Sequence, residues 1–384
     1  IADAKCIFAI GTNTTYAHPV IGMKVKQAAR NGTKLIVANP REIELVRDAD
    51  LWLQQNLGSD VALLMGMMKV IVDEDLHDKA FIEERCENFD AFRDSLNHFN
   101  LKRTEKITGV PKDKIRDAAR IYATEKPSSL LYAMGITQHT HGTDNVMGTA
   151  NLAMLTGNLG KPSAGVNPLR GQNNVQGACD VGALPNVFTG YQVVTDKEIR
   201  KKFESEWGTF LPGETGLTLL EMLDGAHRKE IKALYLIGEN PVLSDPDASH
   251  VEESLKALDF LVVQDIFMSE TAQFADVVLP SASFAEKDGT FTNTDRSVQR
   301  VRKAIEPLGD AQPDWWITCQ IAQRMGGKGF DFEGPSQIME EICRLTPSYG
   351  GITYERLEQG RIQWPCPSTD HPGTPVLHTE RFAR

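Results

Sequence analysis

The residues best suited to ligand binding or catalysis lie in one stretch, Pro168–Asp180. It holds a single Arg, three Gly or Ala positions and five side-chain amides or carboxylates. It shows no periodic apolar pattern typical of a helix or a strand. Glycines beside amides let a backbone approach a polar ligand closely. Arg170 adds a planar, positively charged fork, so the stretch predicts an anionic ligand. The alternative interpretation is a solvated, Asn-rich surface connection.

The elements before this stretch follow a strand–helix–strand order. Residues 5–10 and 33–38 are short apolar runs, and Pro19 begins a helical pattern that extends to about Arg30. This order predicts that the two strands pair in parallel. Ligands of such sheets bind beyond the carboxyl ends of the strands, where Gly11-Thr-Asn13 and Asn39-Pro-Arg41 lie. No GxGxxG sequence is present, so two ordinary turns are the alternative.

A strand at residues 128–134 is followed by a polar segment with two histidines. His139 and His141 alternate along the chain, so on an extended segment they would share one face. A metal-binding pair is one interpretation. We favour polar loop residues beside a ligand, because no Cys or carboxylate completes a ligand set.

The second half repeats the strand–helix pattern after an irregular, charged insertion at 191–216. Strands are predicted at 231–237, 260–263 and 276–279, and later amphipathic helices at 314–324 and 336–345. The expected fold class is therefore α/β, with two Rossmann-like domains that have mainly parallel sheets. We place the first at residues 1–170, the second at 171–345 and an extended tail at 346–384.

Composition excludes several classes of protein. The formal net charge of the 384 residues is −11, which argues against nucleic acid or an anionic membrane surface as a partner. No apolar run is long enough to predict a membrane span. The six Cys are scattered without a CxxC pair, which suits a reducing, cytoplasmic compartment. The chain begins without Met directly before a strand, so we expect a fragment of a longer polypeptide.

Five ordered blocks resemble the molybdopterin-dependent formate dehydrogenases. They are Gly11–Pro19, Leu155–Pro162, the Arg170 stretch, Asp265–Thr271 and Ala275–Arg296. The resemblance reaches to about Pro307, and several ordered blocks are more specific than one short motif. It implies two molybdopterin guanine dinucleotides around one molybdenum or tungsten, with one nucleotide on each Rossmann-like domain.

The resemblance also implies roles for individual residues. Arg170 would be catalytic and would hold the carboxylate of formate. The nucleotide of the first domain would face Asn13, Asn39, Arg41 and Asp60; the pterin side would contact Gly135, Gln138 and Gln172; and the second nucleotide would face Gly238, Glu239, Asn240, Asp265 and Ser281. Asn39 stands where the family more usually has Asp, so this contact lacks a charge. No residue is assigned as a metal ligand.

Parts of the family pattern are absent from the sequence. The Cys-rich segment for a [4Fe–4S] cluster, the Cys or selenocysteine followed by His, and the C-terminal cap domain are not found. We therefore expect a central fragment, inactive on its own, whose partners are the N- and C-terminal domains of the same subunit and possible electron-transfer subunits. The alternatives are another molybdopterin enzyme such as a nitrate reductase, or a scaffold like the large subunit of NADH dehydrogenase.

Overall fold

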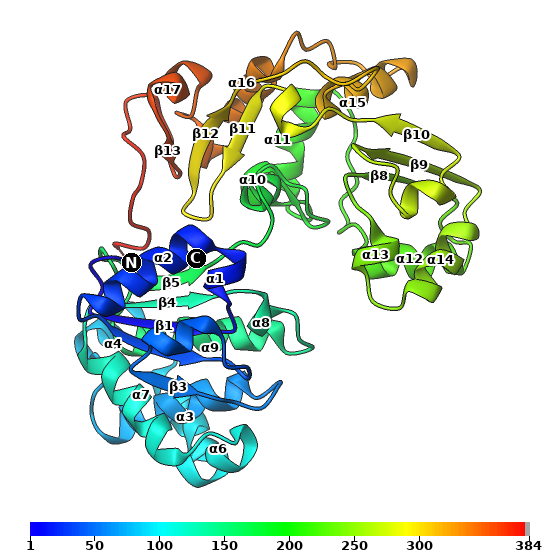
Figure 1. The fold of residues 1–384 in the computed structure, drawn as a ribbon. Coiled ribbons are helices and arrows are strands. Elements are labelled where there is room, and N and C mark those ends of the chain that lie inside the picture. Colours follow the sequence, from blue (N-terminus) through cyan, green and yellow to red (C-terminus); the bar gives the residue numbers. More distant parts are fainter. Residues whose placement is uncertain (381–384) are drawn as a thin grey trace. The chain divides into compact units, whose positions relative to one another are not determined.

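The computed structural model describes residues 1–380, which form two units (Figure 1). The first unit contains residues 1–172 and the described residues from 375 onward, and the second contains residues 173–374. The division after Gln172 lies close to the domain boundary expected at 170. Each unit has its own buried cores, so each is described separately.

The first unit is built on a five-stranded parallel sheet. Its strands, in sheet order, are β3 (Leu51–Leu53), β2 (Lys34–Ala38), β1 (Cys6–Ile10), β4 (Ser128–Tyr132) and β5 (Gly165–Pro168). The expected α/β class with parallel strands is confirmed. Strand β5 was not predicted, because Gly, Asn and Pro are poor strand formers and its side chains are only half-buried. It pairs with β4 at the edge of the sheet.

Helices cover both faces of this sheet (Figure 1). They are α1 (Thr14–Ala17), α2 (Pro19–Arg30), α3 (Asp60–Asp73), α4 (Lys79–Arg85), α5 (Phe89–Ser95), α6 (Leu101–Thr108), α7 (Lys112–Thr124), α8 (Met134–Thr137) and α9 (Gly142–Leu155), with 3-10 turns η1 (Glu44–Asp48) and η2 (Leu96–Phe99). Alternate residues of β1 enter opposite cores: Phe8 packs with α3, α7 and α9, whereas Ile7 packs with α2. Burial on both faces explains why β1 and β2 are continuously apolar.

The strand order determines where a ligand can bind. The chain moves outward from β1 to β2 and β3, then returns to the other side of β1 to form β4 and β5. The connections that follow β1 and β4 therefore leave the sheet in opposite directions. In open parallel sheets, this reversal opens a crevice beyond the carboxyl ends of the two central strands.

The second unit contains a three-stranded parallel sheet of β8 (Ala233–Ile237), β9 (Phe260–Asp265) and β10 (Val277–Pro280), with β9 in the centre. Its helices and 3-10 turns are α10 (Val175–Asp180), α11 (Lys197–Trp207), α12 (Leu219–His227), α13 (Pro241–Ser244), α14 (Ala248–Lys256), α15 (Asp314–Arg324), α16 (Pro335–Leu345), α17 (Tyr354–Gln359), η3 (Thr189–Tyr191), η4 (Thr271–Phe274), η5 (Phe284–Glu286) and η6 (Pro347–Tyr349). Leu223 of α12 and Val251 of α14 pack on one face of this sheet, with Leu261 and Val263. The strand–helix–strand order expected here is confirmed.

The second unit also contains antiparallel pairs that the sequence analysis did not anticipate. Strands β11 (Gly289–Thr292), β12 (Ser297–Val301) and β13 (Ile362–Gln363) form one sheet, and β6 (Val187–Phe188) pairs with β7 (Gln192–Val193). The parallel sheet is therefore only part of this unit. Asn293 to Arg296 makes the turn between β11 and β12, where Asn293 N donates to Ser297 O at 2.9 Å.

Two segments are more ordered than expected. The insertion at 191–216 contains α11, which begins after Asp196, whose carboxylate accepts from two backbone N–H groups. Its Phe203 is fully buried and stacks on Phe188. The extended tail expected at 346–384 is not found over its described residues, 346–380, because Leu357 and Ile362 are buried in a core with Tyr349. The structure of both segments depends on the burial of a few apolar side chains against distant residues. A short, mostly polar sequence does not show which of its side chains are buried.

A buried carboxylate anchors the end of the Arg170 stretch. Asp180, at the end of α10, is 1% exposed. One oxygen accepts from Gln176 Nε2 at 2.7 Å and Tyr191 OH at 2.8 Å; the other accepts from Tyr349 OH at 2.6 Å and Trp364 Nε1 at 2.7 Å. Four neutral donors satisfy the carboxylate and connect α10 to residues far away in the sequence.

Candidate functional site

Two glycines meet beyond the carboxyl ends of β1 and β4. Gly135 N donates to Gly11 O at 3.0 Å, so the two backbones are in direct contact. A Cβ atom at Gly135 would lie 2.4 Å from Gly11 O, and Gly11 has a φ of +57°. Neither position accepts a side chain, and Gly135 is exposed, so a ligand could approach this backbone closely. Gly135 was predicted to bind the cofactor; Gly11 was not, although its place directly after a strand could have indicated it.

Buried polar atoms lie beside these glycines. Among the described residues, Thr12 Oγ1, Asn13 Oδ1 and Thr14 Oγ1 are buried and have no hydrogen-bond partner. Buried polar groups in folded proteins almost always have partners, so these three atoms fit a polar ligand. Asn13 was a predicted site residue. Thr12 and Thr14 were missed, because a hydroxyl in a loop sequence carries no sign of burial.

In the turn after β2, the side-chain amide of Asn39 is hydrogen-bonded within the turn itself. Asn39 Oδ1 accepts from Arg41 N at 3.0 Å, and Asn39 O accepts from Trp52 Nε1 at 2.9 Å. Asn39 is buried and Arg41 is exposed. The carboxamide oxygen of Asn39 therefore stabilises the turn. The charged side chain on the surface of this turn is that of Arg41.

Asp60 brings a carboxylate to the same end of the sheet. It begins α3, is 3% exposed and accepts from Gln55 Nε2 at 3.1 Å. Burial raises the pKa of the Asp60 carboxyl, whereas the Gln55 hydrogen bond and the nearby His139 lower it less strongly. His139 Nε2 in turn is hydrogen-bonded to Gly135 O at 2.9 Å. Asp60, His139 and Gly135 therefore lie in one neighbourhood.

Replacing Asp60 with Asn is expected to stabilise the ligand-free protein at pH 7. Because folding raises this pKa, the ionised carboxylate costs stability above its unfolded pKa of about 4, at about 1.4 kcal/mol per pKa unit, and the cost disappears below that pH. Urea unfolding between pH 7 and pH 3 should show a higher free energy of unfolding for Asp60→Asn than for the native protein. This difference should shrink as the pH falls. Asp73→Asn, at the exposed end of the same helix, is the control. A loss of stability at pH 7 would contradict the prediction.

Arg170 follows the edge strand of the sheet and is half-buried. The preceding residue donates from Leu169 N to Tyr132 O at 2.8 Å, and Arg170 O is hydrogen-bonded to His18 Nε2 at 2.7 Å. Burial raises the pKa of Tyr132, and the positive charge of Arg170 opposes this effect, so the guanidinium lies near the carboxyl end of β4. Gln138 and Gln172 are exposed.

The five residues predicted for the second nucleotide lie at the carboxyl ends of the parallel strands in the second unit. Gly238 has a φ of +66° and follows β8, and Ser281 N donates to Asp265 O at 3.0 Å. The Asn240 amide is engaged within the unit: its oxygen accepts from Thr271 N and Oγ1, and its nitrogen donates to Glu270. Asn240 therefore braces the loop that contains Glu239, which is exposed.

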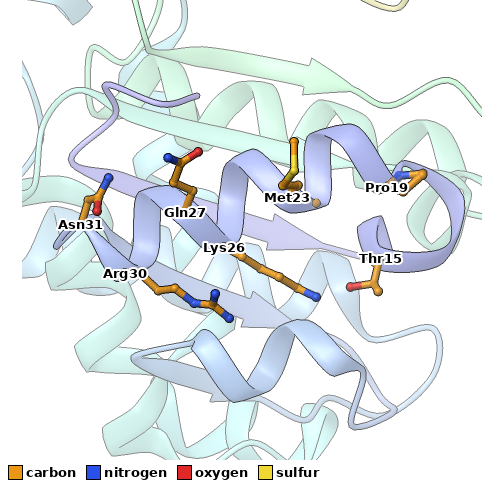
Figure 2. Close-up of a pocket in the computed structure, with 8 residues that line it drawn as sticks. Thr15, Pro19, Met23, Lys26, Gln27, Arg30 and Asn31 are labelled. Carbon is orange, nitrogen blue, oxygen red and sulfur yellow. The ribbon is translucent and has the colours of Figure 1, made fainter.

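A separate pocket of about 610 Å³ runs along α2 (Figure 2). Its lining includes Met23, Lys26 and Arg30, and none of the predicted site residues. Lys26 pairs with Glu44 at 2.6 Å and Arg30 with Asp48 at 3.0 Å. The two positive charges are therefore neutralised by η1, and the pocket offers no excess charge to an anion.

Within residues 1–380, no three His, Cys, Asp or Glu side chains come together in a group that could hold a metal ion.

None of the helices within residues 1–380 is both long and apolar enough to cross a bilayer.

Comparison with known proteins agrees with this fold. The sequence model of the molybdopterin oxidoreductase family matches residues 1–324. The chain belongs to this family. The resemblance found from the sequence is thereby confirmed, and membership implies a molybdopterin-type cofactor with molybdenum or tungsten.

Individual relatives in the molybdopterin oxidoreductase family are longer than this chain. The F420-dependent formate dehydrogenase subunit alpha of Methanocaldococcus jannaschii is 50% identical over 380 residues, which are 99% of this chain and 56% of that protein. Formate dehydrogenase H of Escherichia coli is 45% identical over 386 residues, covering 100% of this chain and 54% of that protein. The chain thus spans about half the length of the curated relatives it matches.

A solved structure shows the same fold at lower identity. Acetylene hydratase from Pelobacter acetylenicus superimposes with a TM-score of 0.75 and 22% sequence identity, covering 94% of this chain and 52% of that chain. At this identity the likeness shows the fold alone. The residues beyond the carboxyl ends of β1 and β4 fit a cofactor of the molybdopterin oxidoreductase family, because they combine two glycines that accept no side chain with buried polar atoms that lack partners.

Proposed function

We propose that the protein oxidises formate to CO2 at a molybdenum or tungsten centre bound by two molybdopterin guanine dinucleotides. The observation that carries the proposal is Arg170, the one Arg in an amide-rich loop, held at the carboxyl end of the sheet by its own backbone carbonyl. Relatives at 45–50% identity that are named formate dehydrogenases match nearly the whole chain.

Each unit would hold one nucleotide. In the first unit, Asn13, Asn39, Arg41 and Asp60 would face the nucleotide, with Gly135, Gln138 and Gln172 on the pterin side. In the second unit, Gly238, Glu239, Asn240, Asp265 and Ser281 would face the other nucleotide. The buried polar atoms at Thr12 and Thr14 support a ligand at the first site. When bound, the metal centre supplies two-electron redox chemistry.

Arg170 would bind and orient the substrate. Formate is a one-carbon carboxylate with no apolar body, so its orientation must come from hydrogen bonds and charge. The guanidinium offers two parallel N–H donors that match the two carboxylate oxygens. Oxidation removes two electrons and one proton from formate and leaves CO2, which is neutral. The charge that Arg170 recognises therefore disappears in the product, which favours product release.

The remaining partners follow from the proposed activity. The electrons would leave through a [4Fe–4S] cluster and electron-transfer subunits, with further domains of the same subunit completing the site. We propose a cytoplasmic location, since all six Cys are free thiols, as expected in a reducing compartment.

Metal analysis and formate oxidation in the full-length protein test the proposal. We expect molybdenum or tungsten near one atom per polypeptide, together with formate-dependent dye reduction. Nitrate-dependent oxidation of a reduced dye, without formate oxidation, would favour a nitrate reductase. A protein with neither metal nor turnover would favour a scaffold.

A further inference from the structure

The side chain of His18, near the start of the chain, contacts the backbone of Arg170, the proposed formate-binding residue. His18 lies between α1 and α2, and its Nε2 is 2.7 Å from Arg170 O, although 152 residues separate them in sequence. His18 is itself fixed by its neighbours: His18 N donates to Thr14 O at 3.0 Å, and Gly22 N donates to His18 O at 2.8 Å. Pro19 directly after it disfavours a helical conformation at His18 and keeps it at the junction.

We infer that His18 is a positioning residue for Arg170: its imidazole fixes the Arg170 carbonyl and thereby the direction in which the guanidinium leaves the backbone. The inference rests on the proposed role of Arg170 in binding formate. It concerns a residue that neither the motif around Arg170 nor the proposed cofactor contacts include.

The chemistry of the contact fixes the state of the ring. A carbonyl oxygen only accepts, so Nε2 must carry the hydrogen and donate it. His18 Nδ1 is buried and has no hydrogen-bond partner among the described residues. The contact therefore requires an N–H at Nε2, and a substitution that removes this donor removes the hydrogen bond.

The residues beside Arg170 do not supply every backbone hydrogen bond of this segment. Pro168, the last residue of β5, has no N–H to donate to the neighbouring strand. Gly171 follows Arg170 and is exposed, so the backbone on that side is conformationally permissive. Two hydrogen bonds from different elements act between these positions: Leu169 N to Tyr132 O, and His18 to Arg170 O. The second involves a side chain, so a substitution of His18 can remove it.

Three substitutions distinguish the effect of the His18 hydrogen-bond donor from the effect of the volume of its ring. In His18→Gln, the amide nitrogen reaches about as far as Nε2 and can still donate. In His18→Asn, the shorter amide does not reach, and in His18→Phe, the ring volume remains without a donor. If His18 positions Arg170, Gln should behave like the native protein, whereas Asn and Phe should not.

Trypsin provides a readout that does not depend on activity, because it cleaves after Arg170, at the carbonyl that His18 holds. Limited proteolysis of the purified full-length protein should release the fragment ending at Arg170 up to roughly tenfold faster in the Asn and Phe variants, as expected for loss of one hydrogen bond. The Gln variant should be cleaved at nearly the native rate. Kinetics should show a higher KM for formate in the Asn and Phe variants, at native metal content.

Equal cleavage rates after Arg170 in the native, Gln, Asn and Phe proteins would overturn the inference. So would loss of the folded state in the donor-free variants, measured by thermal unfolding, because His18 would then support the whole unit. If the native protein does not oxidise formate, the proposed function fails, yet the proteolysis comparison still decides whether His18 fixes the Arg170 backbone.

Discussion

Replacing Arg170 with Lys is expected to lower kcat/KM for formate by about a hundredfold while the metal and pterin content stays near the native level. Lys keeps the positive charge and loses the planar pair of donors. Formate would still be attracted to the site, but its C–H bond would no longer be held in one direction. A misplacement of about 1 Å is enough for a loss of this size.

Steady-state kinetics of the full-length protein, with metal analysis of the same preparation, measure this effect. Arg30→Lys is a matched control, because Arg30 lies on α2 in an ion pair with Asp48 and outside the proposed site. A parallel loss of metal and activity in Arg170→Lys would indicate a structural role. A variant with full cofactor and unchanged kcat/KM would remove Arg170 from the mechanism and weaken the preference for formate.

Replacing Gly135 with Ala is expected to reduce the free energy of unfolding by about 1–3 kcal/mol, the usual cost of forcing extra atoms into a packed site. The added Cβ would lie 2.4 Å from Gly11 O, which belongs to the backbone and cannot rotate away. Gly11 and Gly135 would have to separate, so the hydrogen bond between them would lengthen. Because Gly135 is a proposed cofactor contact, cofactor content should fall as well.

Urea unfolding and pterin content measure the two effects of Gly135→Ala. Gly289→Ala is a suitable control for stability, since no heavy atom lies within 4 Å of the added Cβ and its φ is outside the left-handed region. Native stability in Gly135→Ala would show that the contact with Gly11 relaxes without cost. Native cofactor content in a destabilised variant would show that this pair of glycines does not contact the cofactor.

Local patterns in the sequence were sufficient for the regular elements of the first unit. The apolar runs of β1 and β2 predicted a parallel sheet, because only strands buried on both faces are continuously apolar. The polar residues that follow these strands then predicted the end of the sheet where Asn13 and Asn39 lie. The roles of these residues toward a nucleotide remain predictions.

Elements that depend on distant partners were not predicted. Strand β5 has a sequence unsuited to a strand and exists through its pairing with β4. Helix α11 looked like a charged insertion, although Phe203 is buried against Phe188. Strand β13 is too short to show a period and is fixed by its pairing with β12. In each case the stabilising contact is with a residue far along the chain.

The sequence by itself determined the α/β class, the membership of the family and the stretch around Arg170, because each of these is carried by residues adjacent or regularly spaced in the chain. Only the tertiary structure decided that Gly11 contacts Gly135 and that His18 holds Arg170. The physical reason is that parallel strands bring their carboxyl ends together at one edge of the sheet, whatever their separation in sequence. The residues that meet there are selected by strand order and register, which a single sequence does not display.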